Sequence, residues 1–514
     1  MLKGNAKGSR SWKPSGPWIT ARKVVQYLAL ALFVALIVAA TRGAWRGEWV
    51  NIPMRLDPLL ALTNLLASRT LVVGSLVALV LVALTLLFGR AWCGWLCPLS
   101  TILDIFPLDH WRGERRAPAS SWRGVKYGLL MTILVAAIFG NLTLLIFDPL
   151  TIFARTLTTS VLPWLDQGVT WLESALYRLP FLAAPISTFD AWLRPAILPY
   201  EPLVYRSGWL FAGLFLGVIT LNLFAPRFWC RYLCPLGGML GLLSKVALFK
   251  RGVGESCKAC TLCTIACPTG TVNPAKGYAS DPGECTMCLD CLEACPREGI
   301  TFTTRLSLAP WNHYDPNRRQ ALTSMGATLT GVVLFKSDFL GLSQHPHRLR
   351  PPGALEYELL SKCVRCGMCV RACPTGGLQP ALTEAGLEGL WTPVLTPSLG
   401  YCDYSCNTCG GVCPVEAIPP LPLEEKRTQV IGRAAIDRQR CIAWADQQDC
   451  IVCEEMCPVP EKAVWLEPKW ISNADGSHVR VQLPHVIDED CIGCGICEHK
   501  CPVEGQAAIR VFVG

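Results

Sequence analysis

Two matching cysteine motifs read Cys257-Lys-Ala-Cys260-Thr-Leu-Cys263-Thr-Ile-Ala-Cys267-Pro268 and Cys285-Thr-Met-Cys288-Leu-Asp-Cys291-Leu-Glu-Ala-Cys295-Pro296. Their shared spacing, C-x2-C-x2-C-x3-C-P, holds pairs of [4Fe–4S] clusters, and the fourth cysteine of each motif binds the cluster of the other. We therefore predict one cluster held by Cys257, Cys260, Cys263 and Cys295, and a second held by Cys285, Cys288, Cys291 and Cys267. Zinc, the alternative metal, is bound by separated pairs of ligands, which this spacing does not provide.

Four more cysteine groups, each ending in Cys-Pro, follow after residue 353. The first and last keep the regular spacing, the second has one extra residue in its first gap, and the third has a first gap of eight residues. An insertion there widens the loop but keeps the last three cysteines in place, so we predict four further clusters. The fourth cysteines are exchanged either in nested order, first group with fourth and second with third, or in consecutive order. The predicted ligands are Cys363, Cys366, Cys369, Cys373, Cys402, Cys406, Cys409, Cys413, Cys441, Cys450, Cys453, Cys457, Cys491, Cys494, Cys497 and Cys501.

The composition separates a membrane-like half from a cysteine-rich half. The chain has 514 residues, of which 51% are hydrophobic and 28 are cysteines, and its mean hydropathy is +0.34. Cysteine pairs two residues apart, repeated in series, are typical of metal sites and not of a disulfide framework. The net charge of +8 lies largely beside apolar segments, so we expect no nucleic-acid partner. The sequence contains no C-x-x-C-H haem attachment motif, and it predicts no nucleotide cofactor.

Four apolar stretches before residue 250 are long enough to cross a bilayer, which takes roughly 20 residues. They lie near Val24–Ala40, Thr70–Gly89, Tyr127–Phe147 and Gly208–Phe224. Most lack the polar face that a helix in a soluble core would show. They predict a four-helix transmembrane domain.

The basic residues predict how these spans are oriented. Lysine and arginine concentrate in residues 1–23, 90–126 and 227–251, whereas the other two loops mix both signs of charge. Because positively charged loops stay inside, we expect a cytoplasmic N-terminus. The long outer loop, residues 148–207, has apolar residues at helical spacing around Val161–Leu179. This spacing predicts an amphipathic helix on the outer surface.

A second type of cysteine motif is repeated at the inner ends of two spans. It reads Cys93-Gly-Trp-Leu-Cys97-Pro98-Leu and Cys230-Arg-Tyr-Leu-Cys234-Pro235-Leu. Cysteines at positions i and i+4 share a helical face, so four thiols could converge at the membrane surface. A further metal or cluster site at Cys93, Cys97, Cys230 and Cys234 is one interpretation. A thiol–disulfide pair and plain structural packing are the others.

Paired arginines precede an apolar run between the two cysteine-rich regions. The run ends at Phe335 and follows Arg318 and Arg319, as in a twin-arginine export signal. We favour a membrane crossing here, which would place everything after about residue 340 outside. The alternative is a cytoplasmic linker helix with two chance arginines. An uncleaved signal would add a fifth span.

Together these features resemble two components of periplasmic nitrate reductase systems. The spans, the two C-x3-C-P motifs and the tandem cysteine motifs resemble the NapH type. The chain from Arg318 onward resembles the NapG type, with a twin-arginine signal and four clusters. The sequence is therefore similar to a NapH–NapG fusion, and only its fused state and the long first gap after Cys441 depart from that pattern.

The resemblance implies a quinol dehydrogenase in the bacterial inner membrane. It would draw electrons from the quinone pool and deliver them to a periplasmic reductase or a multihaem cytochrome c. Asp57 and Asp148, near outer span ends, could accept quinol protons or could simply cap helices. The alternatives are a maturation or regulatory ferredoxin for a respiratory metalloenzyme, and an anchor without its own quinol site.

We thus expect a mixed fold, in which a four-helix transmembrane domain precedes two α+β bacterial ferredoxin-like domains. The predicted domains are residues 1–250, 251–310, the signal-like linker 311–352 and 353–514. The first ferredoxin-like domain is expected in the cytoplasm and the second in the periplasm. The predicted cofactors are six [4Fe–4S] clusters, with quinol as the redox substrate.

Overall fold

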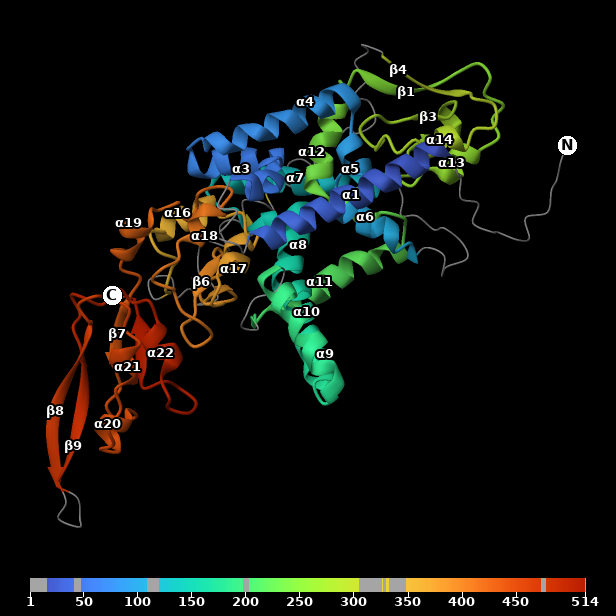
Figure 1. The fold of residues 1–514 in the computed structure, drawn as a ribbon. Helices are drawn as coiled ribbons and strands as arrows, with labels where there is room; N and C mark the ends of the chain where they lie inside the picture. The colour runs from blue at the N-terminus through green and yellow to red at the C-terminus, as the bar shows by residue number, and fades with distance from the viewer. Residues whose placement is uncertain are drawn as a thin grey trace. The chain divides into compact units, whose positions relative to one another are not determined.

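The structure, a computed structural model, describes residues 16–40, 48–108, 120–196, 203–304, 326, 330–331, 348–472 and 478–513. Its contacts divide the chain into two compact units, each built from segments far apart in the sequence. The first unit contains Met1–Leu36, Ile52–Phe153 and Ala212–Val333. The second contains Ile37–Asn51, Ala154–Phe211 and Leu334–Gly514. Figure 1 labels the elements of both.

Apolar helices form the larger part of the first unit. Helices α3 and α12 both pack against α7, and α12 also packs against α4. The helical elements are α1 (Pro17–Ala39), α2 (Ile52–Arg55), α3 (Pro58–Ser68), η3 (Val73–Val77), α4 (Ala78–Phe88), α5 (Ala91–Trp95), α6 (Pro98–Ile105), η5 (Ser120–Arg123), α7 (Gly124–Ile138), η6 (Thr143–Phe147), α8 (Pro149–Thr156), α11 (Gly208–Thr220), η9 (Leu221–Leu223), η10 (Trp229–Leu233) and α12 (Pro235–Ser244). The last residues of α1 and α8 belong to the second unit.

Each of the four predicted spans contains a helix, but the helices differ in length. Within the described residues, only α1 is long and apolar enough to cross a membrane by itself, with 23 residues and a mean hydropathy of 1.8. The second span joins the 3-10 turn η3 to α4, and the third ends early, where α7 stops before Gly140 at a φ of 77°. The fourth consists of α11 and the turn η9. The four-span domain therefore stays a prediction.

The remainder of the first unit is a small α+β fold built around the first two cysteine motifs. Strand β1 (Phe249–Val253) pairs antiparallel with β4 (Ile300–Thr304), and β2 (Val272–Asn273) pairs antiparallel with β3 (Ala279–Ser280). The short helices α13 (Leu262–Ala266) and α14 (Asp290–Glu293) follow the motif loops, and η11 (Pro274–Lys276) joins β2 to β3. The buried residues of its core are Cys263, Val272, Cys291 and Ile300, so cysteines make up half of that core.

The second unit is a longer α+β fold with three antiparallel strand pairs. These pairs are β5 with β6, β7 with β10, and the long β8–β9 hairpin seen in Figure 1. The elements are η2 (Glu48–Asn51), η7 (Leu157–Val161), α9 (Leu162–Leu176), η8 (Pro180–Leu182), α10 (Ala183–Ala196), α16 (Glu356–Lys362), α17 (Met368–Ala372), β5 (Leu378–Pro380), β6 (Pro393–Leu395), α18 (Thr408–Gly411), α19 (Leu423–Arg427), β7 (Arg433–Ile436), α20 (Ile442–Ala445), α21 (Val452–Glu455), β8 (Val464–Ser472), β9 (His478–Val486), α22 (Ile496–Lys500) and β10 (Ile509–Phe512).

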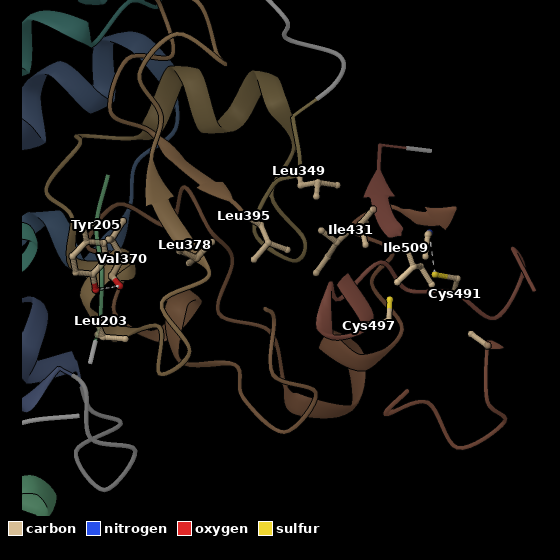
Figure 2. Close-up of a cluster of buried hydrophobic side chains, with 13 residues drawn as sticks. Leu203, Tyr205, Leu349, Val370, Leu378, Leu395, Ile431, Cys491, Cys497 and Ile509 are labelled. Atoms are coloured by element: carbon tan, nitrogen blue, oxygen red, sulfur yellow. Dashed lines mark hydrogen bonds between the residues drawn. The ribbon is translucent and has the colours of Figure 1, made fainter. Parts of the chain in front are cut away.

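The predicted outer loop, residues 148–207, folds largely into this second unit. Leu203 and Tyr205 join the buried apolar cluster of the C-terminal region beside Val370, as Figure 2 shows. The Tyr205 hydroxyl donates a hydrogen bond to the Val370 carbonyl at 3.2 Å, and the Gln379 amide donates one to the Val204 carbonyl at 3.0 Å. The loop is therefore part of the fold that carries the last four cysteine groups.

Three further predictions have different outcomes. Helix α9 occupies most of Val161–Leu179, where an amphipathic helix was expected. The run Ala507–Val513 after the last cysteine group is rich in β-forming residues and predicts a strand, and β10 forms there. The twin-arginine-like segment ending at Phe335 lies almost entirely outside the described residues. The predicted linear domain boundaries stay predictions, because the compact units follow contacts rather than chain order.

Candidate functional site

The four regular cysteine motifs share one loop conformation. In each, the residue before the second cysteine and the residue after it have positive φ, as at Ala259 (55°) and Thr261 (64°). Two of the motifs use glycine at one or both of these positions, where such a backbone costs least. The other three pairs are Met287 and Leu289, Arg365 and Gly367, and Gly493 and Gly495. A short helix then begins and carries the third cysteine, so the spacing fixes a hairpin-like loop with three thiols on its inside.

Four cavities are each lined by four of the predicted cysteine ligands. Three cysteines come from one motif and the fourth from its partner motif. The cavities contain Cys257, Cys260, Cys263 and Cys295; Cys363, Cys366, Cys369 and Cys413; Cys441, Cys450, Cys453 and Cys501; and Cys457, Cys491, Cys494 and Cys497. This grouping is the cross-ligation expected of two-cluster folds.

The two remaining sets of four are brought together in the same manner. Cys285, Cys288 and Cys291 interact electrostatically with Cys267. Cys409 interacts with Cys402, Cys406 and Cys373. In the C-terminal region the first group therefore exchanges its fourth cysteine with the second, and the third with the fourth. The structure has the consecutive order and not the nested one.

The lining of these cavities fits cubane clusters. Burial raises the pKa of the Cys285 and Cys366 thiols to about 12, so a cation is needed to hold them as thiolates. N–H groups point at several sulfurs: Gly299 N lies 3.3 Å from Cys295 Sγ, and Arg251 Nε lies 3.3 Å from Cys291 Sγ. Burial and hydrogen bonds to sulfur are the means by which a protein tunes cluster potential. The residues present thus match [4Fe–4S] ligation, which supplies one-electron chemistry.

The two C-x3-C-P motifs adopt a bent conformation that differs from the continuous helix expected. Helix α5 ends at Trp95, and Cys97 and Cys234 become the N-cap residues of α6 and α12 because the following prolines begin new helices. Gly237 N donates a hydrogen bond to Cys234 Sγ at 3.2 Å. Thiols at helix N-termini lie where the helix dipole favours negative charge.

The four cysteines of these motifs lie near one another in the first unit. Cys234 interacts electrostatically with Cys230, Cys93 and Cys97, and all four are buried. Burial raises the pKa of Cys97 and Cys234 well above the usual range. Within the part of the chain that the structure describes, no three Cys, His, Asp or Glu side chains are placed as a single metal ion would require. The further metal or cluster site thus stays a prediction.

The second cysteine loop is clamped onto the C-x3-C-P motifs. Trp95 Nε1 donates a hydrogen bond to the Met287 carbonyl at 2.8 Å, and Arg90 donates one to the Gly283 carbonyl at 2.8 Å. Gly94 lies so close to the Thr286 carbonyl that a Cβ there would be 2.2 Å from its oxygen. The loop that holds Cys285, Cys288 and Cys291 is therefore pressed against the first C-x3-C-P motif.

Buried charges complete this clamp. Lys126 Nζ lies 2.6 Å from both Glu284 carboxylate oxygens, and Arg90 lies 3.6 Å from the same carboxylate. Arg22 pairs with Asp290 at 2.7 Å. Breaking such a pair on one side leaves a buried charge unpaired, which is strongly destabilising. From the sequence alone, these basic residues were interpreted only as signals of membrane orientation, and their contact with the second cysteine loop was not predicted. Glu284 and Asp290, beside and inside the second motif, are the acidic residues that could have indicated it.

In the second unit an arginine from the predicted outer loop reaches the cavity of Cys363. Arg155 Cζ lies 4.1 Å from the ring centre of Trp391 and 5.0 Å from that of Phe211. Trp391 and Arg365 line that cavity, and Arg155 Nη1 donates a 3.4 Å hydrogen bond to the Arg365 carbonyl. No motif in the sequence signals this contact, because it joins residues about 210 positions apart.

Asp57 and Asp148 meet in the first unit as a buried carboxyl pair. Each caps a helix: Asp57 accepts hydrogen bonds from Leu59 N and Leu60 N, and Asp148 accepts them from Leu150 N and Thr151 N. The two carboxyl groups lie close enough to influence each other's titration, and a hydrogen bond between them would require a shared proton. Burial raises the pKa of Asp57 to about 6, and burial together with the Asp57 carboxylate raises that of Asp148 well above its usual range.

Comparison with known proteins agrees with the cysteine geometry. The profile of a 4Fe-4S binding domain matches residues 70–112 and 207–254, and another of the same description matches residues 359–379. The first two matches each contain one C-x3-C-P motif. Methylamine utilization ferredoxin-type protein MauM of Methylorubrum extorquens is 35% identical over 206 residues, which are 38% of this chain and 89% of the relative.

This chain belongs to the MauM and NapG family of ferredoxin-type proteins. MauM of Paracoccus denitrificans is 40% identical over 168 residues, covering 32% of this chain and 70% of the relative. Ferredoxin-type protein NapG of Escherichia coli is 34% identical over 201 residues, covering 37% of this chain and 80% of the relative. No solved structure matches. The family confirms an iron–sulfur, ferredoxin-type electron-transfer protein.

The clamp predicts an effect of Gly94→Ala. The added Cβ would meet the Thr286 carbonyl, so the loop of Cys285 must move away from the first C-x3-C-P motif. We expect a loss of roughly 1–3 kcal/mol, as for other overpacked sites, measured as a lower apparent Tm and faster proteolysis within residues 251–304. The control is Gly128→Ala in α7, where a Cβ meets nothing within 4 Å. Equal behaviour of the two variants would contradict the clamp.

The carboxyl pair predicts a pH dependence of stability. Because the folded pKa of Asp57 is raised from 3.8 to about 6, the folded state holds protons more tightly than the unfolded state. The contribution of Asp57 to stability is therefore complete below about pH 4 and falls by roughly 1–3 kcal/mol as the pH rises through 6. Asp148→Asn keeps the helix cap and donates to Asp57, so the fall should shrink.

Apparent Tm against pH in detergent measures this difference. Glu424→Gln, at a side chain that is 83% exposed, serves as the control and should keep the wild-type profile. If Asp148→Asn kept the wild-type profile as well, the shared proton would be excluded.

Proposed function

We propose that this protein is a multi-pass protein of the bacterial inner membrane that oxidises quinol and passes single electrons to an acceptor in the periplasm. The clamp between the second cysteine loop and the C-x3-C-P motifs is the observation that carries the proposal. It holds a predicted cluster site against the ends of the apolar helices, near the depth at which a membrane-bound quinol reacts. The acceptor class is a periplasmic reductase or a multihaem cytochrome c.

Each residue group has a distinct role in this proposal. The apolar helices hold the chain in the bilayer and give quinol access. The 24 motif cysteines would hold six [4Fe–4S] clusters, which supply the one-electron steps, and Cys93, Cys97, Cys230 and Cys234 would form a further redox site. The Asp57–Asp148 pair, near the predicted outer span ends and away from the clamp, would take up a proton only from a quinol that reacts at that end of the bundle.

The distribution of loops between the two units supports the proposed sidedness. The segments Ile37–Asn51 and Ala154–Phe211, which include parts of both predicted outer loops and the adjoining ends of two predicted spans, fold with the last four cysteine groups. Asn51 donates a hydrogen bond to the Gly411 carbonyl at 3.1 Å, and Tyr205 donates one to Val370. The basic segments instead fold with the first two motifs. Charge bias and contacts therefore both support the proposed outer location of the C-terminal region.

The relatives support a role in electron transfer. MauM is named for methylamine utilization, and NapG is named a ferredoxin-type protein. We infer a comparable role for this chain, with electrons delivered to or taken from an oxidoreductase outside the cytoplasm. A chain that carries both apolar helices and all six motif sets would connect the quinol pool to that partner without a separate membrane subunit.

The function is tested by adding a reduced quinol to the anaerobic, oxidised protein. We expect the visible absorbance of the clusters to bleach and the EPR signals of reduced [4Fe–4S] clusters to appear. Iron near 24 atoms per chain, four for each of six clusters, shows that the sample is loaded, and dithionite gives the fully reduced reference. Clusters that dithionite reduces but quinol leaves oxidised would refute the quinol-dehydrogenase proposal.

The sidedness is tested with reporters fused after Gly514. Alkaline phosphatase folds only outside the cytoplasm, so we expect it to be active there and a cytoplasmic fluorescent reporter to be dark. Arg318→Lys with Arg319→Lys should reduce the phosphatase signal if the twin arginines direct export. The same reporters fused after Gly252, beside the first motif, are the control and should give the opposite result. An inactive phosphatase together with a fluorescent cytoplasmic reporter at Gly514 would contradict the proposal.

A further inference from the structure

Helices α9 and α10 form a hairpin with charged side chains inside and apolar side chains outside, the reverse of the usual arrangement in a water-soluble protein. The two helices contain four charged residues, Asp166, Glu173, Asp190 and Arg194, and all four meet in one network. The Arg194 guanidinium lies 3.7 Å from Asp166, 3.0 Å from Glu173 and 2.5 Å from Asp190. Asp166 and Glu173 are buried. The charged residues of the two helices thus face the interior of the hairpin, whereas Arg178, in the turn region, is exposed.

The opposite face of α9 is apolar and exposed. Trp164, Leu165, Trp171 and Leu172 repeat at helical spacing and are 50%, 56%, 72% and 51% exposed. Phe181, in the turn between the two helices, is 75% exposed. Helices on the surface of a water-soluble protein show the reverse order, with apolar residues inside and charges outside. This face therefore suits a surrounding of low dielectric constant.

We propose that the α9–α10 hairpin lies in the outer leaflet of the bilayer, with the apolar face of α9 against lipid acyl chains. The inference rests on the membrane anchoring proposed above. The hairpin begins soon after the third predicted span and ends before the fourth, so both of its ends return to the membrane surface. Tryptophan with leucine is the composition of interfacial helices. Arg194, together with Arg371, which also acts on Asp166, offsets part of the negative charge of the three carboxylates and so lowers the cost of bringing them close to lipid.

The hairpin would also fix the second unit at the membrane surface. The same segment continues into Tyr205 and Leu203, which pack in the buried cluster of the C-terminal region. At the other end, Arg155 lies against Trp391. A hairpin seated in lipid would hold the predicted cluster site of Cys363 at a constant distance from the bilayer.

A photoreactive residue tests the proposal in the full-length protein within native membranes. Trp171→p-benzoylphenylalanine places the probe on the apolar face of α9, and Tyr357→p-benzoylphenylalanine is the control, at a residue that is 77% exposed on α16. After irradiation, mass spectrometry of the purified chain distinguishes phospholipid adducts from crosslinked polypeptide. We expect several-fold more phospholipid adduct at 171 than at 357, with unchanged iron content in both variants.

Two outcomes would overturn the proposal. Crosslinks from position 171 to a polypeptide, either a second copy or another protein, would make the face a protein interface. Lipid adducts no more frequent than at 357 would show that the face is not in lipid. The result is independent of the quinol test, because clusters could be reduced by quinol without lipid adducts, or adducts could form in a protein that quinol fails to reduce.

The interior network has its own readout. Arg194→Gln removes the only cation of the hairpin's own network, so the three carboxylates would seek water. We expect the lipid adducts from position 171 to fall several-fold in this background, whereas Arg178→Gln, an exposed arginine in the turn region, leaves them unchanged. Adducts that persist fully without Arg194 would contradict the role given to internal neutralisation.

Discussion

Burial of cysteine thiols is the constraint on which both cysteine-rich folds depend. A thiol taken out of water resists ionisation, and burial raises the pKa of Cys285, Cys366 and Cys453 to about 12. Iron ligation reverses this preference, because the thiolate is the ligand and metal binding is coupled to folding. Cysteines are also part of the apolar cores, as Cys263 and Cys291 are in the first unit. With two-stranded sheets alone, such small folds have little other stabilisation.

The basic residues near the apolar helices serve two purposes. Arg22, Arg90 and Lys126 add to the positive charge that predicts a cytoplasmic location, yet each is buried and paired with Asp290 or Glu284. A buried pair contributes specificity, because any other docking would leave a charge uncompensated. The same side chains thus carry the charge from which the orientation is predicted, and they select the cysteine loop that lies against the apolar helices.

The sequence predicts the local chemistry well and the long-range arrangement poorly. Motif spacing was enough to group Cys257 with Cys295, because in paired motifs the fourth cysteine of each motif binds the cluster of the other. It did not choose between nested and consecutive order in the C-terminal region, since the irregular first gaps at Cys402 and Cys441 made a like-with-like pairing plausible. The bend at Cys97 was readable from Pro98, which begins a new helix.

Hydrophobic periodicity in the sequence does not predict contacts between segments that are distant in the chain. The sequence around Arg155 does not predict its contact with the Trp391 ring, and the sequence around Tyr205 does not predict its hydrogen bond to the Val370 carbonyl. Such contacts are set by which surfaces fold together, and only their chemistry class, an arginine over an aromatic ring or a hydroxyl to a carbonyl, is generic.

The two units hold their cysteine loops by different physics, and this difference bears on function. In the first unit, the loop of Cys285 is fixed by buried ion pairs and by the absence of a side chain at Gly94, an arrangement that tolerates little displacement. In the second unit, the segment 154–207 contacts the cysteine-rich region through neutral hydrogen bonds at Tyr205 and Gln379 and through the Arg155 guanidinium stacked on Trp391. Neutral contacts cost less to break and re-form than unpaired buried charges do. Under the proposed function, a rigid contact would suit the cluster site that takes electrons from quinol, and a more adaptable one would suit a region that binds a separate redox partner.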